Sequence, residues 1–300
     1  YQGKDFIDED RASIDELQQF QIVKKIKEAL PISNLLYPEK NTVQNILQAI
    51  NDIKQQNISP EIFKKITEQN IRLIEKSEKY LDILDEIANL KSTDKTSGSL
   101  PIKDQKIEAF YNLYSRIKDI DEARIHENTP TFLEKIYKSF EEQAAKYEQD
   151  PKKSIQHFTR DWQNKFFDKN QNNHYKFSDS FTSKKALDLA EVFRLYEQEL
   201  KTNNLQDFND MILRAINLLE QKPEFRFSMQ EKYQFILLDE YQDTNGSQSK
   251  IVELLTTNPN IDGFEPNVLA VGDDDQAIMA FQGAKSSNMN DFAKLYKDKT

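Results

Sequence analysis

The sequence predicts an α/β protein in which a short parallel sheet near the carboxyl end follows a large, mostly α-helical region. Charged residues make up 31% of the 300 residues and only six are glycine, a balance typical of long amphipathic helices. Two short apolar runs, at 235–238 and 268–271, flank a helical pattern, and each ends in acidic residues. The order strand, helix, strand predicts a parallel sheet with buried strands.

The first helical patterns run from Ile14 to about Leu90 and are interrupted at "ALPISN" and "NISPEIF". In the second interruption we expect Ser59 to cap a helix and Pro60 to be its first residue. The segment 71–90 contains neither glycine nor proline and predicts one long helix. Its apolar stripe consists of Ile74, Leu81, Leu84 and Ala88.

Residues 91–104 are polar and aperiodic and predict a loop, whereas residues 132–147 predict another helix. Between 152 and 177, basic residues alternate with aromatic ones. This mixture fits a surface that stacks on single-stranded nucleic acid, but helix cores with solvated basic faces are the more frequent explanation.

Two amphipathic helices are then predicted, at 186–200 and 207–220. The apolar positions expected to face the core are Leu189, Val192, Phe193, Tyr196 and Leu200 in the first, and Phe208, Met211, Ile212, Ala215 and Leu219 in the second. Asp207 and Asp210 stand at the start of the second helix, where capping explains them adequately.

Composition narrows the class of protein. The net charge of -10 does not fit a uniformly basic nucleic-acid coat, so any contact with nucleic acid has to be local. The absence of cysteine excludes disulfides and thiolate chemistry and fits a cytoplasmic protein. Three scattered histidines, His126, His157 and His174, lack the spacing of a zinc site. No run is long and apolar enough for a membrane span, and we expect the chain to be an excerpt of a longer protein.

Acidic residues stand where both predicted strands end. Asp239 and Glu240 follow the first apolar run, and Asp273 to Asp275 follow the second. Ligands of parallel sheets bind at the carboxyl ends of the strands. An aspartate there can hold Mg²⁺, and the next glutamate can accept a proton from an attacking water. The three aspartates lack the spacing of a calcium loop.

The two strand-end patterns taken together are more specific than either pattern alone. The stretch "FILLDEYQDTNGSQ", followed by "VLAVGDDDQAIMAFQGA", resembles the second and third helicase motifs of the UvrD/Rep group of superfamily 1 DNA helicases. The run "LQDFNDMILRAINLLEQ" just upstream also follows that group. The resemblance is close from about Ala186 to Thr300. It implies part of a RecA-like P-loop NTPase domain with a parallel sheet and a large helical insertion. We expect residues 1–203 to form the insertion (1B-like) and 204–300 the C-terminal part of the first RecA-like domain (1A-like).

The resemblance also assigns roles. Asp239 matches the Mg²⁺ aspartate, Glu240 the catalytic base for nucleotide hydrolysis, and Gln276 the glutamine that contacts the γ-phosphate. Phe281 matches an aromatic residue that stacks on DNA bases. Met279 and Gln282 stand at DNA-contacting positions where the group commonly has Tyr and Arg. The two departures put the strength of DNA contact in doubt, but not the family.

The implied function is that of an ATP-dependent DNA helicase or translocase, moving 3′ to 5′, with ATP and Mg²⁺ as cofactors and single-stranded and duplex DNA as partners. The sequence contains no phosphate-binding loop of the form G-x-x-x-x-G-K-S/T. We therefore expect the 300-residue chain alone to be inactive. Two alternatives stay open: a non-catalytic helicase-like scaffold that binds DNA or protein, and a helicase fused to a nuclease.

Overall fold

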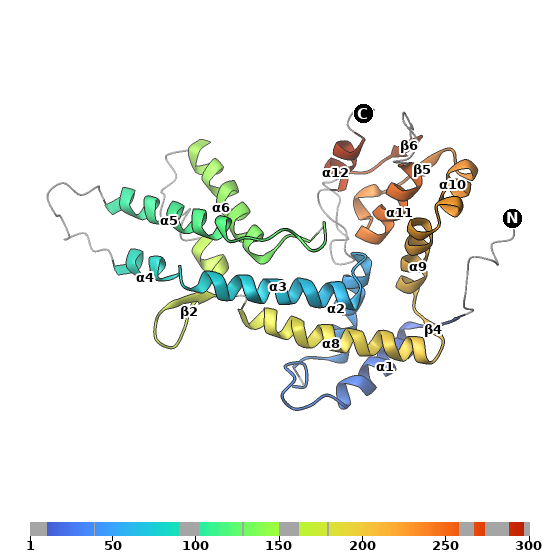
Figure 1. Ribbon diagram of the computed structural model, residues 1–300, viewed down its shortest axis with the longest axis horizontal. Helices are drawn as coiled ribbons and strands as arrows, with labels where there is room; N and C mark the ends of the chain where they lie inside the picture. The colour runs from blue at the N-terminus through green and yellow to red at the C-terminus, as the bar shows by residue number, and fades with distance from the viewer. Residues whose placement is uncertain are drawn as a thin grey trace. The chain divides into compact units, whose positions relative to one another are not determined.

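The computed structural model describes residues 11–38, 40–89, 102–127, 129–149, 162–178, 180–257, 267–273 and 288–296. The chain divides into two compact units, one comprising Tyr1–Pro60 and Glu191–Thr300 and the other Glu61–Ala190 (Figure 1). This division into compact units does not test where an inserted domain ends. The boundary expected at residue 203 therefore stays a prediction. None of the described helices has the length and apolarity needed to cross a membrane.

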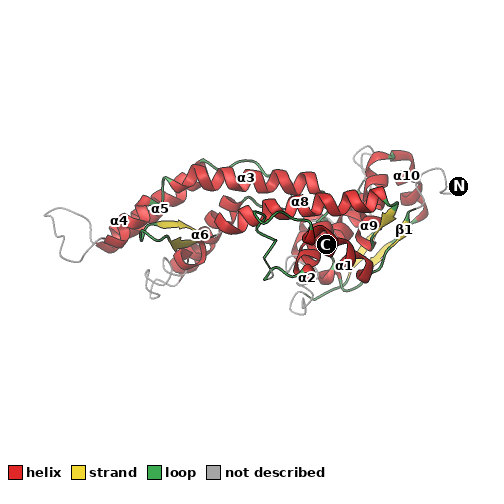
Figure 2. Ribbon diagram, turned by 90° about the horizontal axis from the view of Figure 1, so that it is seen from below, coloured by secondary structure: helices red, strands yellow, loops and turns green. Residues whose placement is uncertain are grey.

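The unit Glu61–Ala190 is built mainly from helices. Its elements are α3 (Pro60–Glu78), α4 (Asp82–Asn89), α5 (Ile102–Asp119), α6 (Phe132–Gln149), β2 (Phe167–Lys169), β3 (Tyr175–Phe177) and the first part of α8 (Ser180–Thr202). The strands β2 and β3 form an antiparallel pair, drawn in yellow in Figure 2. The predicted helix at 132–147 is confirmed as α6, and Pro60 is the first residue of α3 as expected. Of the loop expected at 91–104, residues 91–101 lie outside the described residues, and residues 102–104 belong instead to the first turn of α5.

The long helix predicted at 71–90 is two helices. α3 ends at Glu78 and α4 begins at Asp82. Ser77 is buried, and its Oγ donates back to the carbonyl oxygens of Leu73 and Ile74. The amides of Tyr80 and Leu81 bond to carbonyls three residues back, which tightens the chain into a turn. Of the predicted apolar stripe, Ile74, Leu81 and Leu84 are buried as expected, whereas Ala88 is exposed and its neighbour Ile87 is buried instead.

Trp162 lies at the centre of the aromatic core of this unit. Its ring is fully buried and packs edge-on against Phe140, with a centroid distance of 5.1 Å. The indole Nε1 donates to the carbonyl oxygen of Ile136 at 3.1 Å, so the polar atom of the ring is paired. Phe167 is also buried. These two aromatic residues of the 152–177 segment are therefore core residues rather than a stacking surface.

The other unit combines helices with two short parallel sheets (Figure 2). Its elements are β1 (Ala12–Ser13), α1 (Glu16–Glu28), α2 (Val43–Gln55), the end of α8, β4 (Leu205–Gln206), α9 (Phe208–Gln221), α10 (Pro223–Lys232), β5 (Ile236–Leu238), the 3-10 turn η2 (Tyr241–Asp243), α11 (Gly246–Thr256), β6 (Val268–Ala270) and α12 (Asn288–Leu295). β1 pairs with β4, and β5 pairs with β6. α9 packs against α2, α10 and α11.

The predicted strand, helix, strand order is confirmed in β5, α11 and β6, but the prediction of buried strands is wrong for one face of the sheet. Leu238, Val268 and Ala270 pack against Tyr241, Phe292 and Tyr296. On the opposite face, Leu237 is 76% and Leu269 is 58% exposed. The apolar pattern predicts two covered faces, whereas the described residues cover one.

The apolar stripe predicted for α9 is wrong at Phe208, Met211 and Ala215. Leu219 is buried as expected, but Ala215 is exposed and its neighbour Ile216 is buried instead. At the beginning of the helix, Phe208 is 66% exposed and Met211 is also exposed. The reason is the capping box at the start of the helix. Asp207 accepts from the Asp210 amide at 2.8 Å, and the Asp207 amide donates to Asp210 at 3.0 Å. Both aspartates are buried, so the side chains next to them along the helix face outward.

A buried lysine explains why the two aspartates point inward. Lys54 in α2 is only 1% exposed, and its Nζ lies 2.7 Å from Asp207 Oδ2 and 2.7 Å from Glu197 Oε1. Nζ also forms an ion pair with Asp210. The hydroxyl of Tyr196 donates to Asp207 at 3.0 Å. We refer to Lys54, Tyr196, Glu197, Asp207 and Asp210 as the Lys54 cluster.

The charges of the Lys54 cluster do not balance, because three carboxylates face one ammonium. Burial raises the pKa of Glu197 to about 7, and the charges of Asp210 and Asp207 add to this effect. Burial also raises the pKa of Asp210. Burial alone would lower the pKa of Lys54, but Asp207 and Glu197 hold it above its usual range. The lysine therefore keeps its charge, whereas Glu197 and Asp210 retain their protons to a higher pH than exposed carboxyl groups would.

The main chain of Lys54 makes a further contact, with α11. Its carbonyl oxygen accepts from Ser247 Oγ at 2.9 Å. This contact requires a close approach of the two helices at Gly246, where an added Cβ would lie 3.2 Å from Cα of Gln56. Lys54 thus contacts α8 and α9 through its ammonium and α11 through its carbonyl.

We predict that Lys54→Met lowers the free energy of unfolding by about 3–5 kcal/mol, the usual result of leaving buried carboxylates without their cation. Chemical denaturation of the 300-residue chain measures this change. The control is Lys24→Met on α1, where an exposed lysine faces Glu28 at 3.9 Å. The control is expected to change the free energy by less than about 0.5 kcal/mol. Equal effects of the two substitutions would contradict the prediction.

The raised pKa of Glu197 predicts a pH dependence of stability. The ordinary glutamate pKa is 4.5 and the folded value is about 7, so between these values the folded chain binds a proton that the unfolded chain has released. The free energy of unfolding therefore falls as pH rises through this window. Glu197→Gln should make the decline between pH 5 and 7.5 shallower in thermal melts. Glu199→Gln, on the same helix but facing Lys25 at 2.9 Å, should keep the wild-type decline.

Candidate functional site

The candidate site lies at the carboxyl end of the β5–β6 sheet. The strands are parallel with Leu238 opposite Ala270, and the ladder continues as the Val271 amide donates to Leu238 O at 2.8 Å. The Tyr241 amide then donates to Val271 O at 3.0 Å. Asp239 and Glu240 lie between these two rungs of the ladder and are both exposed. The structure thus brings the predicted carboxylates to the edge where parallel sheets bind ligands.

Glu240 has an unusual backbone conformation. Its φ is 49° and its ψ is 44°, in the left-handed region. The other non-glycine residues with positive φ in the described part of the chain are Asn57, Asn173 and Asn204. Asparagine tolerates this conformation well, whereas a glutamate there is strained by about 1–3 kcal/mol. Such strain is concentrated at functional sites, where the rest of the structure maintains it.

Hydrogen bonds hold the turn that follows β5. The Asp243 amide donates to Glu240 O at 2.9 Å, and the Glu240 amide donates to Asp239 Oδ1 at 3.1 Å. The ring of Tyr241 is buried against Phe292, with 5.2 Å between ring centroids. The carboxylates therefore stand on a turn anchored in the core of the sheet.

Gln242 connects the two strand ends through its side chain. Its Nε2 donates to Glu240 Oε2 at 2.6 Å, and its Oε1 accepts from the Asp273 amide at 3.0 Å. Gln242 is only 2% exposed. Sequence reasoning missed this residue, because burial of a glutamine cannot be read from a short polar string. The one sequence signal that could have identified Gln242 is its position two residues after Glu240, the candidate base.

The turn leads directly into α11. Asn245 caps this helix by accepting from the Gln248 amide at 3.0 Å, and the Gln248 side chain returns a bond to the Asn245 amide. Asp243, just before the cap, has a buried Oδ1 that receives no hydrogen bond from the described residues. The start of α11 is thus fixed on one side by its cap and on the other by the contact of Ser247 with Lys54 O.

Other predicted site residues cannot be placed. Gln276, Met279, Phe281 and Gln282 lie outside the described residues, as do Asp274 and Asp275. Asp273 is described and exposed. The roles given to these residues by resemblance stay predictions.

Two sets of carboxylates differ in their suitability for a metal ion. Glu197, Asp207 and Asp210 offer oxygen atoms within 4.8 Å of one another, but the ammonium of Lys54 already occupies the space between them. Asp239 and Glu240 are exposed. Mg²⁺ retains several waters and needs one or two protein carboxylates besides substrate phosphates. The exposed pair at the strand end therefore fits Mg²⁺, and the buried set fits an ammonium ion.

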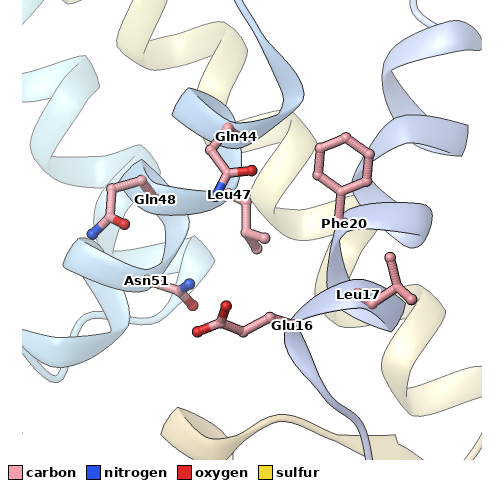
Figure 3. A pocket seen from close by; sticks show the side chains of 7 residues that line it. All are labelled: Glu16, Leu17, Phe20, Gln44, Leu47, Gln48 and Asn51. Carbon is pink, nitrogen blue, oxygen red and sulfur yellow. The ribbon is translucent and has the colours of Figure 1, made fainter.

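A separate hollow of about 380 Å³ lies between α1 and α2 (Figure 3). Its lining combines apolar side chains with amides and one carboxylate: Glu16, Leu17, Phe20, Gln44, Leu47, Gln48 and Asn51. None of the site residues predicted from the sequence lines it. Asn51 is engaged there with Asn209, whose Nδ2 donates to it at 3.1 Å.

The described residues form a mostly helical protein with small parallel sheets, one of which carries exposed carboxylates at its carboxyl end. The family model described as the UvrD/REP helicase N-terminal domain matches residues 90–297, and the chain belongs to this family. It is 40% identical over 110 residues to the ATP-dependent DNA helicase PcrA of Staphylococcus aureus and 39% identical to that of Staphylococcus epidermidis. Each alignment covers 37% of this chain and 14% of the relative.

We predict that Glu240→Gly leaves the chain more stable than Glu240→Ala by about 1 kcal/mol, because both remove the carboxylate but only alanine keeps a Cβ in the left-handed region. Chemical denaturation of the two variants measures the difference. The matched pair is Glu253→Gly and Glu253→Ala within α11, where alanine should be the more stable by about 1 kcal/mol. The same sign at both positions would contradict the left-handed assignment.

Proposed function

We propose that this chain is part of an ATP-dependent DNA helicase or translocase that moves 3′ to 5′ on single-stranded DNA and unwinds duplex DNA. The observation that carries the proposal is the exposed Asp239–Glu240 pair at the carboxyl end of a parallel strand, with Glu240 in a strained conformation. Membership of the UvrD/REP helicase family supports it. The relatives named as ATP-dependent DNA helicases support the choice of ATP and DNA.

In the proposed reaction, water attacks the γ-phosphate of ATP and the bond to the β-phosphate breaks, releasing ADP and phosphate. Glu240 orients the water and accepts its proton. Asp239 is the residue that would hold Mg²⁺, and bound Mg²⁺ would offset the negative charge on the phosphates. The exposure of both carboxylates is compatible with access by a nucleotide.

The remaining roles are proposed from the motif resemblance. Gln276 would contact the γ-phosphate, and Phe281 would stack on a DNA base, with Met279 and Gln282 at neighbouring DNA-contacting positions. Stacking on an aromatic ring contributes about 1–3 kcal/mol per base and is tolerant of sequence.

We also propose that the β5–β6 pair belongs to a RecA-like sheet and that residues 204–300 are its share of that domain. The open face at Leu237 and Leu269 supports this proposal. Exposed, contiguous apolar surface on a sheet is costly, and in parallel α/β domains both faces are covered. Further strands and helices of the same domain would provide that cover.

We predict that Glu240→Gln in the full-length protein leaves ATP binding nearly intact and lowers ATP turnover by roughly 10²- to 10⁴-fold, because the amide keeps the shape of the side chain but cannot take the proton. Steady-state phosphate release with Mg²⁺ and single-stranded DNA measures turnover. Glu253→Gln on α11 is the matched control and should retain wild-type turnover. A Glu240→Gln variant within threefold of wild type would refute the assignment, and the 300-residue chain alone should show no turnover.

A further inference from the structure

The side chain of Gln242 has two arms, and each contacts a different strand end. One arm donates from Nε2 to Glu240 Oε2 at 2.6 Å, and the other accepts at Oε1 from the Asp273 amide at 3.0 Å. The last main-chain rung of the sheet, from the Tyr241 amide to Val271 O, lies immediately before it. Gln242 therefore extends the β5–β6 ladder by one side-chain rung, which joins the turn after β5 to the chain leaving β6.

The hydrogen bond from Gln242 restricts the side chain of Glu240. Its side chain is exposed and long, so its carboxylate would otherwise sample several rotamers. Burial restricts Gln242, so the bond to Glu240 transfers that restriction to the carboxylate. The bond occupies Oε2, and Oε1 receives no hydrogen bond from the described residues. The hydrogen bond to Oε2 therefore leaves the other oxygen of the carboxylate for a proton.

We propose that Gln242 is a positioning residue that holds the Glu240 carboxylate in register with the end of β6 and so sets the rate of the hydrolytic step. The inference rests on the proposed function, because it assumes that Glu240 is the base. A misplacement of about 1 Å in a reacting group can cost 10²-fold in rate. Loss of the Nε2 arm is therefore expected to lower kcat roughly 10- to 100-fold, with the KM for ATP changing less than about threefold.

The two arms can be separated by substitution. In Gln242→Glu, a carboxylate oxygen can still accept from the Asp273 amide, but nothing donates to Glu240 and two like charges meet. Gln242→Met removes both arms while keeping a similar volume. The matched control is Gln230→Met, because Gln230 is also buried and its Nε2 binds the carbonyl oxygens of Leu254 and Thr257 at 3.0 and 2.9 Å.

The test combines turnover with hydrogen exchange in the full-length protein. We expect kcat to fall in both Gln242 variants and to stay near wild type in Gln230→Met. Amide exchange at Asp273 should be faster in Gln242→Met and close to wild type in Gln242→Glu, since only the former loses the acceptor. A thermal melt of each variant verifies folding, and Gln242→Glu keeps the test valid if the methionine variant does not fold.

Glu240→Gln separates the failure of this inference from the failure of the proposed function. If Glu240→Gln is inactive and Gln242→Glu turns over within threefold of wild type, Gln242 has only a structural role and the inference is overturned. If Glu240→Gln itself remains active, the proposed function fails first. Loss of turnover in Gln230→Met equal to that in Gln242→Met would also overturn the inference, because the effect would then follow from loss of any buried amide.

Discussion

The ion pairing of the Lys54 ammonium is the interaction on which the unit formed by Tyr1–Pro60 and Glu191–Thr300 depends. A lysine that is 1% exposed is stable only if its charge is paired, and here it meets carboxylates from α8 and α9 at 2.7 Å. The same residue accepts the Ser247 hydroxyl through its carbonyl and so fixes the start of α11. Since the Asp239–Glu240 turn leads directly into α11, the residue that carries this buried charge also helps to fix the position of the candidate site.

The strands, the helix between them and the location of the carboxylates could all be predicted from sequence, because each depends on local pattern. Apolar runs of four residues at 235–238 and 268–271 identify two strands, and acidic residues at their ends mark the carboxyl edge of the sheet. The capping role of Asp207 was also predictable, since an acidic residue before an apolar repeat is a local signal.

What could not be predicted depends on partners distant in sequence. Lys54 lies in an amphipathic helix, where a lysine is ordinarily solvated, and its partner Asp207 is 153 residues away. This pairing turns the aspartates of α9 inward and leaves Phe208 exposed, contrary to hydrophobic periodicity. The apolar character of Leu237 likewise indicates that this face of the strand packs against other residues. It does not indicate whether those residues belong to the described part of the chain.

The Lys54 cluster also constrains how this sequence can change. Replacement of the lysine leaves three buried carboxyl groups without their cation, and the three carboxyl groups share that one cation, so the effects of single substitutions are not additive. Tolerated changes therefore require concerted substitutions on α2, α8 and α9. The cluster is expected to be inherited or lost as a set, which makes the joint occurrence of these residues a better mark of related chains than any one of them alone.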